Sequence, residues 1–299
     1  MRAMRIAILS AWLSAIAAAP ALAEPPRVVA DIAPVHALVA RVMEGVGEPD
    51  LLLPPGASPH DFAFRPSDAR RLSEADLVVW VGPELTPWLA EPLDRLAPDA
   101  TRLTLIDTEG WPRRALTEVD HGDHAHAGEI DPHAWLDPQV AAVWVVAIAR
   151  ALAEADPDNA NHYAANAAAA RTELAALAEE VFATLPDAPR AYVYPHAAYG
   201  YFTARFGLPE GLDIAPSDGT DPGPVRLSDL RTALAGDTAL CIFTDAEVGA
   251  DYARVLAEGH PDTRIVELDP IGADLEPGAE LYPALIRAMA GAFATCLAP

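Results

Sequence analysis

Three histidines and one aspartate each follow a short apolar segment of the kind that forms buried strands. They are His60 after residues 50–53, His133 after residues 103–107 and a polar stretch, His196 after residues 191–194, and Asp269 after residues 264–268. If those segments are strands of parallel sheets, all four side chains lie at the carboxyl edge of a sheet, where ligands bind in such folds. Three imidazoles and one carboxylate make a tetrahedral ligand set that suits Zn2+.

Taken singly, none of these four residues would point to a metal. A histidine in a loop is more often a surface or hydrogen-bonded residue, and an aspartate before a proline is common in turns. What favours the metal-ligand interpretation is their shared position, together with the prolines that directly precede the histidines and stiffen the backbone: Pro59, Pro132 and Pro195.

The remaining sequence predicts the strands and helices that would position these side chains. Strands are expected at 27–31, 50–53, 77–81 and 103–107, with helices at 35–46, 66–74, 85–96 and 138–155. A stretch rich in Ala, Glu and Leu then predicts one uninterrupted helix of about 28 residues that ends near residue 185. After it, strands are expected at 191–194, 212–215, 239–244 and 264–268, with helices at 198–206, 225–235, 248–258 and 281–295.

Strands that alternate with helices form parallel sheets covered on both faces. The predicted fold class is therefore α/β: two (β/α)4 lobes with parallel sheets, joined by one long backbone helix, with the metal site in the cleft between the lobes. The expected boundaries are 24–156 for the N-terminal lobe, 157–185 for the linking helix and 186–299 for the C-terminal lobe. The long helix should limit opening to small movements of the loops around the site.

Residues 1–23 are typical of a secretory signal peptide. Arg2 and Arg5 precede an apolar stretch at 6–19, and residues 21–23 form a small-x-small cleavage site. A membrane anchor is the alternative, but the apolar stretch is shorter than the ~20 residues that a span needs. With no cysteine near the cleavage site, lipid attachment there is excluded, so the sequence predicts a soluble, exported protein.

The charge of the chain narrows the classes of ligand. The 44 acidic residues outweigh 20 basic ones, every one of them Arg, and give a formal net charge of -24. Such a surface repels phosphate backbones and anionic lipids, which makes nucleic-acid binding and peripheral membrane binding poor hypotheses. Cationic ligands fit this charge better.

The chain has two cysteines, Cys241 and Cys296. In an oxidising compartment such a pair is most simply a disulfide. Two buried free thiols are the alternative, and neither cysteine lies in a recognisable nucleophile motif.

Four motifs together resemble one known family. They are the runs 55–62 (PGASPHDF) with 65–68 (RPSD), 131–138 (DPHAWLDP), 196–202 (HAAYGYF) and 268–272 (LDPIG). In this order they resemble the zinc-specific periplasmic solute-binding proteins of ABC importers, the ZnuA-like members of the metal-binding cluster A-I family, over essentially the whole mature chain. The resemblance implies a high-affinity Zn2+ receptor in the periplasm, with an ABC permease and its ATPase as partners and a zinc metallochaperone as a further candidate partner.

The same resemblance implies the ligand residues. His60, His133 and His196 match the family's histidine ligands, and Cys241 and Cys296 match a disulfide that zinc members often carry. Asp269 matches a fourth position at which members differ, since a carboxylate, water or a nearby acid fills it. Receptors of this type are expected to be monomers and not enzymes.

A polar segment at 120–129 contains further candidate ligands: His121, Asp123, His124 and His126. Zinc members of the family often carry a mobile loop here that is rich in histidine and acids, and this segment is similar to a short version of it. It would hold a second, weaker metal. A solvated loop without metal is the alternative.

Other functions stay open at this stage. Manganese members usually have a carboxylate where this chain has His196, and three imidazoles favour zinc over manganese or iron. A secreted zinc hydrolase would need an open coordination position, and a surface adhesin is disfavoured by the negative charge and by the lack of a lipidation cysteine. The catalytic motif H-E-x-x-H and the nucleotide-binding loops are absent from the sequence.

Overall fold

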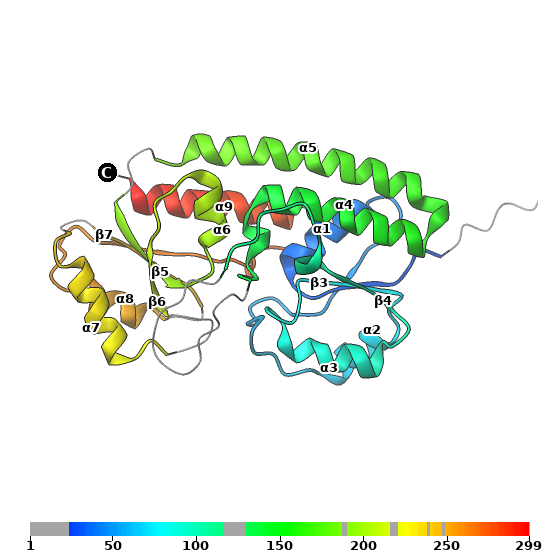
Figure 1. The fold of residues 1–299 in the computed structure, drawn as a ribbon, viewed down its shortest axis with the longest axis horizontal. Helices are drawn as coiled ribbons and strands as arrows, with labels where there is room; N and C mark the ends of the chain where they lie inside the picture. Colours follow the sequence, from blue (N-terminus) through cyan, green and yellow to red (C-terminus); the bar gives the residue numbers. More distant parts are fainter. Residues whose placement is uncertain are drawn as a thin grey trace, which may run out of the picture.

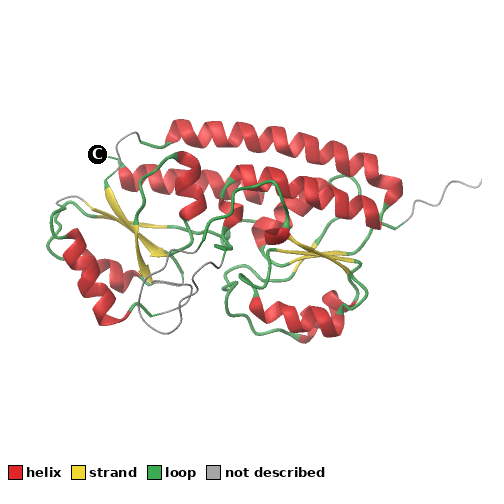
Figure 2. Ribbon diagram, viewed as in Figure 1, coloured by secondary structure: helices red, strands yellow, loops and turns green. Residues whose placement is uncertain are grey.

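The computed structural model describes residues 24–115, 130–186, 190–215, 221–237, 240–246 and 249–298. The predicted signal peptide and the histidine-rich segment at 120–129 lie outside these residues. Two four-stranded parallel sheets lie side by side below a layer of long helices, and shorter helices cover the opposite faces (Figure 1, Figure 2). This arrangement confirms the predicted α/β fold class.

The first sheet is built from the N-terminal part of the chain. Its strands, in order across the sheet, are β2 (Asp50–Leu51), β1 (Val28–Ala30), β3 (Leu77–Trp80) and β4 (Thr101–Thr104). Alternate side chains of each strand point to opposite faces. Val29 and Val78 pack with α2 (Pro66–Ser73) and α3 (Pro87–Leu96) on one face. Val28 and Val79 belong to the larger core on the other face, which includes α1 (Ala33–Met43).

The second sheet repeats this plan. Its strands, in order, are β6 (Leu212–Ala215), β5 (Ala191–His196), β7 (Leu240–Thr244) and β8 (Arg264–Glu267). Val193 and Ile242 pack with α7 (Gly223–Leu234) and α8 (Ala250–Ala257) on one face. Tyr194 and Phe243 join the larger core on the other face, with α6 (Gly200–Phe206) and α9 (Leu281–Leu297). Both faces of each sheet are therefore covered.

Two long helices connect the sheets. α4 (Pro138–Ala155) packs along α5 (Ala160–Thr184), and α5 also contacts α1 and α9. With 25 residues, α5 is about 38 Å long and runs above both sheets (Figure 1). One continuous core cluster contains residues from both sheets and from these helices. A large rotation of one sheet against the other would disrupt that packing, which supports the expected restriction of opening.

Among the described helices, one is long and apolar enough to cross a membrane, namely α4. Half of it is buried inside the protein, where Trp144, Ile148 and Leu152 are fully covered. α4 is therefore a helix of the protein core.

Several predicted boundaries differ from those of the structure by two or more residues. The strand expected at 103–107 is β4 at Thr101–Thr104, and Leu105–Asp107 form a 3-10 turn. The side chains of Thr101 and Arg102 on this edge strand are exposed, so the strand lacks the apolar run from which it would be predicted. β2 covers only Asp50–Leu51 of the expected 50–53. The long helix is shorter than about 28 residues, because Pro157–Asn159 form a separate 3-10 turn.

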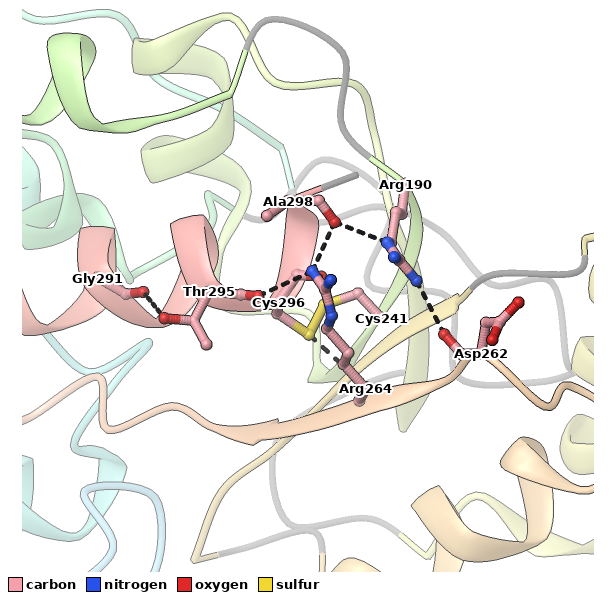
Figure 3. The surroundings of a disulfide bond; sticks show 8 residues. All are labelled: Arg190, Cys241, Asp262, Arg264, Gly291, Thr295, Cys296 and Ala298. Atoms are coloured by element: carbon pink, nitrogen blue, oxygen red, sulfur yellow. Dashed lines mark hydrogen bonds between the residues drawn. A yellow bond between two sulfur atoms is a disulfide. The ribbon is translucent and has the colours of Figure 1, made fainter.

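Cys241 of β7 and Cys296 of α9 form a disulfide (Figure 3), which confirms the expected pairing. Both residues are fully buried. Next to it, the guanidinium groups of Arg190 and Arg264 donate hydrogen bonds to the carbonyl oxygen of Ala298 at the end of α9, at 2.7 and 2.5 Å. Cationic side chains at a helix C-terminus satisfy its last carbonyls and oppose its dipole. The disulfide and both arginines thus fix α9 to the second sheet.

Candidate metal centre

The fold brings three of the four predicted ligands together. One potential donor atom from each of His60, His133 and His196 lies within 4.8 Å of the others. The ring centroids are 5.5 Å apart for His60 and His133, 5.7 Å for His133 and His196, and 6.5 Å for His60 and His196. His133 and His196 are buried, whereas His60 is partly exposed. Among the described residues this is the one group of three or more metal-ligating side chains.

His60 lies in the loop that follows β2. Its backbone N–H donates to the hydroxyl of Ser58 at 3.2 Å. The indole N–H of Trp88, on α3, donates to the carbonyl oxygen of Pro59 at 2.7 Å, and the ring of Trp88 packs 5.0 Å from that of Phe62. The loop on both sides of His60 is therefore fixed to α3.

His133 lies just before a 3-10 turn that leads into α4. Oδ1 of Asp131 accepts hydrogen bonds from the backbone N–H of His133 at 2.9 Å and from its ring Nδ1 at 2.8 Å. The next aromatic residue, Trp135, is fully buried; its indole donates to the carbonyl oxygen of Pro270, and its own carbonyl accepts from the hydroxyl of Tyr282. His133 thus sits on a segment that is bound to residues following the second sheet.

His196 is the last residue of β5. Its Nδ1 lies 2.7 Å from Oδ2 of Asp245, which directly follows the neighbouring strand β7. The hydroxyl of Tyr199 donates to the same oxygen at 3.5 Å. A carboxylate accepts hydrogen bonds and does not donate them, so Nδ1 of the imidazole carries the proton in this contact.

The sequence reasoning did not identify Asp131 and Asp245. Each accepts a hydrogen bond from Nδ1 of one histidine, so the lone pair of that imidazole is on Nε2, the nitrogen that can bind a metal. Asp245 follows a strand directly, as the predicted ligands do, and this position was the signal that could have identified it.

Asp269 lies beside the three histidines but not among them. It lines a cavity of about 290 Å³ that is also lined by His60, His133 and His196. Its Oδ1 accepts hydrogen bonds from the backbone N–H groups of Ile271 at 3.1 Å and Gly272 at 2.8 Å. The carboxylate therefore stabilises the turn after β8 in this structure and is a neighbour of the three-histidine group rather than a member.

Further contacts join the two halves around the site. Arg205 of α6 forms a bidentate ion pair with Asp137, the residue before α4, with N–O distances of 2.6 and 2.7 Å. The side chain of Asp137 is only 4% exposed. The hydroxyl of Tyr201 accepts a hydrogen bond from the backbone N–H of Arg114 at 2.8 Å. The segments that carry His133 and His196 are thereby linked directly.

Two other carboxyl groups have pKa values well above that of an exposed aspartate. Burial raises the pKa of Asp213, on β6, to about 6, although the charge of Arg226 acts to lower it. Burial also raises the pKa of Asp31, which follows β1, to about 7, against hydrogen bonds that favour its ionised form. In both cases the low solvation of the carboxyl group disfavours its ionised form.

Known proteins are similar to this chain in both sequence and fold. The chain is 40% identical to the high-affinity zinc uptake system protein ZnuA of Paracoccus denitrificans, over 94% of either chain. It is 32% identical to the ZnuA of Yersinia pestis, over 96% of this chain and 98% of the relative. The structure matches the periplasmic zinc binding protein TroA from Treponema pallidum with a TM-score of 0.76 at 22% identity, covering 92% of this chain and all of that one.

A zinc-bound ZnuA deletion mutant has a similar fold, with a TM-score of 0.78 at 23% identity, covering 92% of this chain and 99% of that chain. The family model described as zinc-uptake complex component A periplasmic matches residues 28–296. Since this match spans nearly all of the described residues, the chain belongs to the ZnuA family.

Proposed function

We propose that this protein captures Zn2+ in the periplasm and delivers it to the membrane permease of an ABC importer, which an ATPase drives. The observation that carries the proposal is the group formed by His60, His133 and His196 at the meeting point of the two sheets. Its donor set is all nitrogen, which suits zinc, whereas manganese prefers oxygen ligands. The names of the relatives from Paracoccus denitrificans and Yersinia pestis support the same cargo.

Asp269 is the proposed fourth ligand. It lines the same cavity as the histidines, and only its Oδ1 is used by the backbone of the turn. Zn–N distances of ~2.0–2.1 Å place tetrahedral donors about 3.3 Å apart, closer than the 4.8 Å limit within which the histidine donors lie. We expect the loops that carry His60 and Asp269 to move inward by about 1 Å when zinc binds, with no large rotation of the sheets.

This role is binding and not catalysis. A closed site of three histidines and one carboxylate leaves no coordination position for a water nucleophile, which a catalytic zinc ion requires. The alternative within the same family is a receptor for manganese or iron. A secreted zinc hydrolase is a more distant alternative, and turnover of esters or phosphates by the zinc-loaded protein would support it.

Several further assignments belong to this proposal. Residues 1–23 would direct export and be removed, the mature chain would act as a monomer, and the lobes would comprise 24–156 and 186–299 around the helical link at 157–185. A periplasmic metallochaperone is a further candidate partner. The candidate ligands of the segment at 120–129, His121, Asp123, His124 and His126, would hold a second, weaker zinc ion.

Metal competition tests the proposed cargo. The purified mature protein, freed of metal, is titrated with Zn2+ and with Mn2+ at one pH against chelators of known affinity. We expect one tight zinc ion per chain that excess Mn2+ does not displace. Displacement of zinc by Mn2+ at comparable concentrations would overturn the zinc assignment. The Asp269→Asn variant, titrated in parallel, tests the fourth ligand. An unchanged zinc affinity in this variant would indicate that water, and not Asp269, fills the fourth coordination position.

A further inference from the structure

We infer that Asp245 and Asp131 are positioning residues that fix His196 and His133 in the tautomer whose Nε2 faces the metal. The inference rests on the proposed function in that these histidines are the ligands. It assigns a role to two buried carboxylates that the ligand set leaves unexplained. Both are nearly covered, with 8% of Asp245 and 4% of Asp131 exposed.

The geometry of the two contacts carries the inference. The Nδ1–oxygen distances are 2.7 Å for His196 with Asp245 and 2.8 Å for His133 with Asp131, which are the lengths of charge-assisted hydrogen bonds. Each carboxylate can only accept, so each imidazole carries its proton on Nδ1 and directs its Nε2 lone pair away from the carboxylate. A metal-bound histidine commonly has such a partner, which also raises the basicity of the ligand.

The two carboxylates differ in their position in the sequence relative to the histidine that each contacts. Asp131 lies two residues before its histidine and binds both the backbone N–H and the ring, so it fixes the whole turn. Asp245 lies 49 residues after its histidine, at the end of a neighbouring strand, and accepts hydrogen bonds from the side chains of His196 and Tyr199. Asp245 is therefore the sharper test, because its substitution removes a contact with the His196 ring and leaves the residues next to His196 in the sequence unchanged.

Charge adds a second reason for carboxylates at these positions. Three neutral imidazoles and the Asp269 carboxylate offset only one of the two positive charges of a zinc ion, and an uncompensated buried charge is costly. Asp131 and Asp245 place one negative charge behind each of two imidazoles. An amide at either position would keep a hydrogen-bond acceptor and lose this charge, so the two contributions can be separated.

The experiment compares Asp245→Asn and Asp245→Ala with the wild-type protein. Nitrogen-15 NMR of the metal-free proteins at pH 8 reads the tautomer of His196. We expect Nδ1 protonation in the wild type and in Asp245→Asn, and a mixture of tautomers in Asp245→Ala. Zinc affinity should fall by roughly 10–100-fold in Asp245→Ala and by less in Asp245→Asn.

The control is Asp156→Asn. Asp156 is a similarly buried aspartate, 6% exposed, and accepts hydrogen bonds from Asn159 and Tyr163. It follows the last residue of α4, about 27 Å along the helix from the end near His133. This variant should keep the wild-type His196 tautomer and zinc affinity, even if its stability falls.

The outcomes separate this inference from the proposed function. An Nδ1-protonated His196 together with unchanged zinc affinity in Asp245→Ala would overturn the positioning role. If Asp245→Ala does not fold, unchanged visible absorption of the Co2+-loaded Asp245→Asn protein together with unchanged zinc affinity would overturn the charge contribution. A wild-type protein that does not bind zinc would refute the proposed function, while the tautomer measurement on the metal-free protein would still decide the role of Asp245.

Discussion

The ion pair between Arg205 and Asp137 gives a prediction about how the two halves are held together. Both guanidinium contacts are short, at 2.6 and 2.7 Å, and the side chains of Asp137 and Arg205 are 4% and 23% exposed. In the Arg205→Ala variant, the carboxylate of Asp137 would stay buried with one remaining hydrogen bond in the described structure, from the backbone N–H of Gln139 at 2.8 Å. We expect this variant to be much less stable than the wild type.

The expected magnitude follows from the burial. Removal of one partner of a buried ion pair costs about 3–5 kcal/mol, since the other charge is left uncompensated. Because Arg205 retains some contact with water, we expect the lower end of this range, about 3 kcal/mol. Replacement of both partners, in the double variant Arg205→Met with Asp137→Asn, should recover much of the loss, because asparagine still caps α4 and no charge stays buried.

The assay is urea unfolding of the metal-free proteins, followed by circular dichroism, with the free energy of unfolding taken from the midpoint and slope. Arg287→Ala is the matched control. Arg287 also contacts both oxygens of a carboxylate on another helix, that of Glu180, but both side chains are 51% exposed, so its loss should change the free energy of unfolding much less. A loss below 1 kcal/mol in Arg205→Ala, or no recovery in the double variant, would refute this reasoning.

Three further predictions concern pH and the disulfide. Burial raises the pKa of Asp31 from 3.8 to about 7, so the folded protein binds this proton more tightly than the unfolded chain does. Relative to the Asp31→Asn variant, the free energy of unfolding of the wild type should fall by on the order of 4 kcal/mol as pH rises from 4 to 8. Urea titrations in which the difference between the two proteins stays constant with pH would contradict this. Loss of the Cys241–Cys296 disulfide, which joins residues 55 positions apart, should cost up to roughly 4 kcal/mol in the double Cys→Ala variant, and an unchanged unfolding midpoint would argue against a stabilising role. Zinc affinity should fall about tenfold or more between pH 7.5 and 5.5, because ligating imidazoles must be neutral; calorimetry that shows constant affinity over this range would exclude imidazole ligands.

The alternation of apolar runs with helical patterns was sufficient to predict both sheets. It failed where a strand lies at an edge: Thr101 and Arg102 face solvent, so β4 lacks the apolar run that marks the central strand β3. The same pattern could not show that the two halves share one core, since a hydrophobic period gives the buried face of a helix but not the partner of that face.

Part of the candidate site could be predicted from the sequence. The three histidines were predicted from their position after strands, and the fold brings them together. The role of Asp245 was not predicted, because its contact with His196 depends on the pairing of β5 with β7, which places residues 49 positions apart side by side. The contact between Asp137 and Arg205 was missed for the same reason, since it joins helices that are distant in the sequence.

The most direct test of the proposed zinc site is the metal content and zinc affinity of four proteins: the wild type and the His60→Ala, His133→Ala and His196→Ala variants. His162→Ala serves as the control, because His162 is an exposed histidine on α5 outside the group. We predict one tightly bound zinc ion per wild-type chain, an affinity lowered by about 100-fold or more in each of the three variants, and no change in the control. Wild-type zinc affinity in any of the three variants would contradict the site.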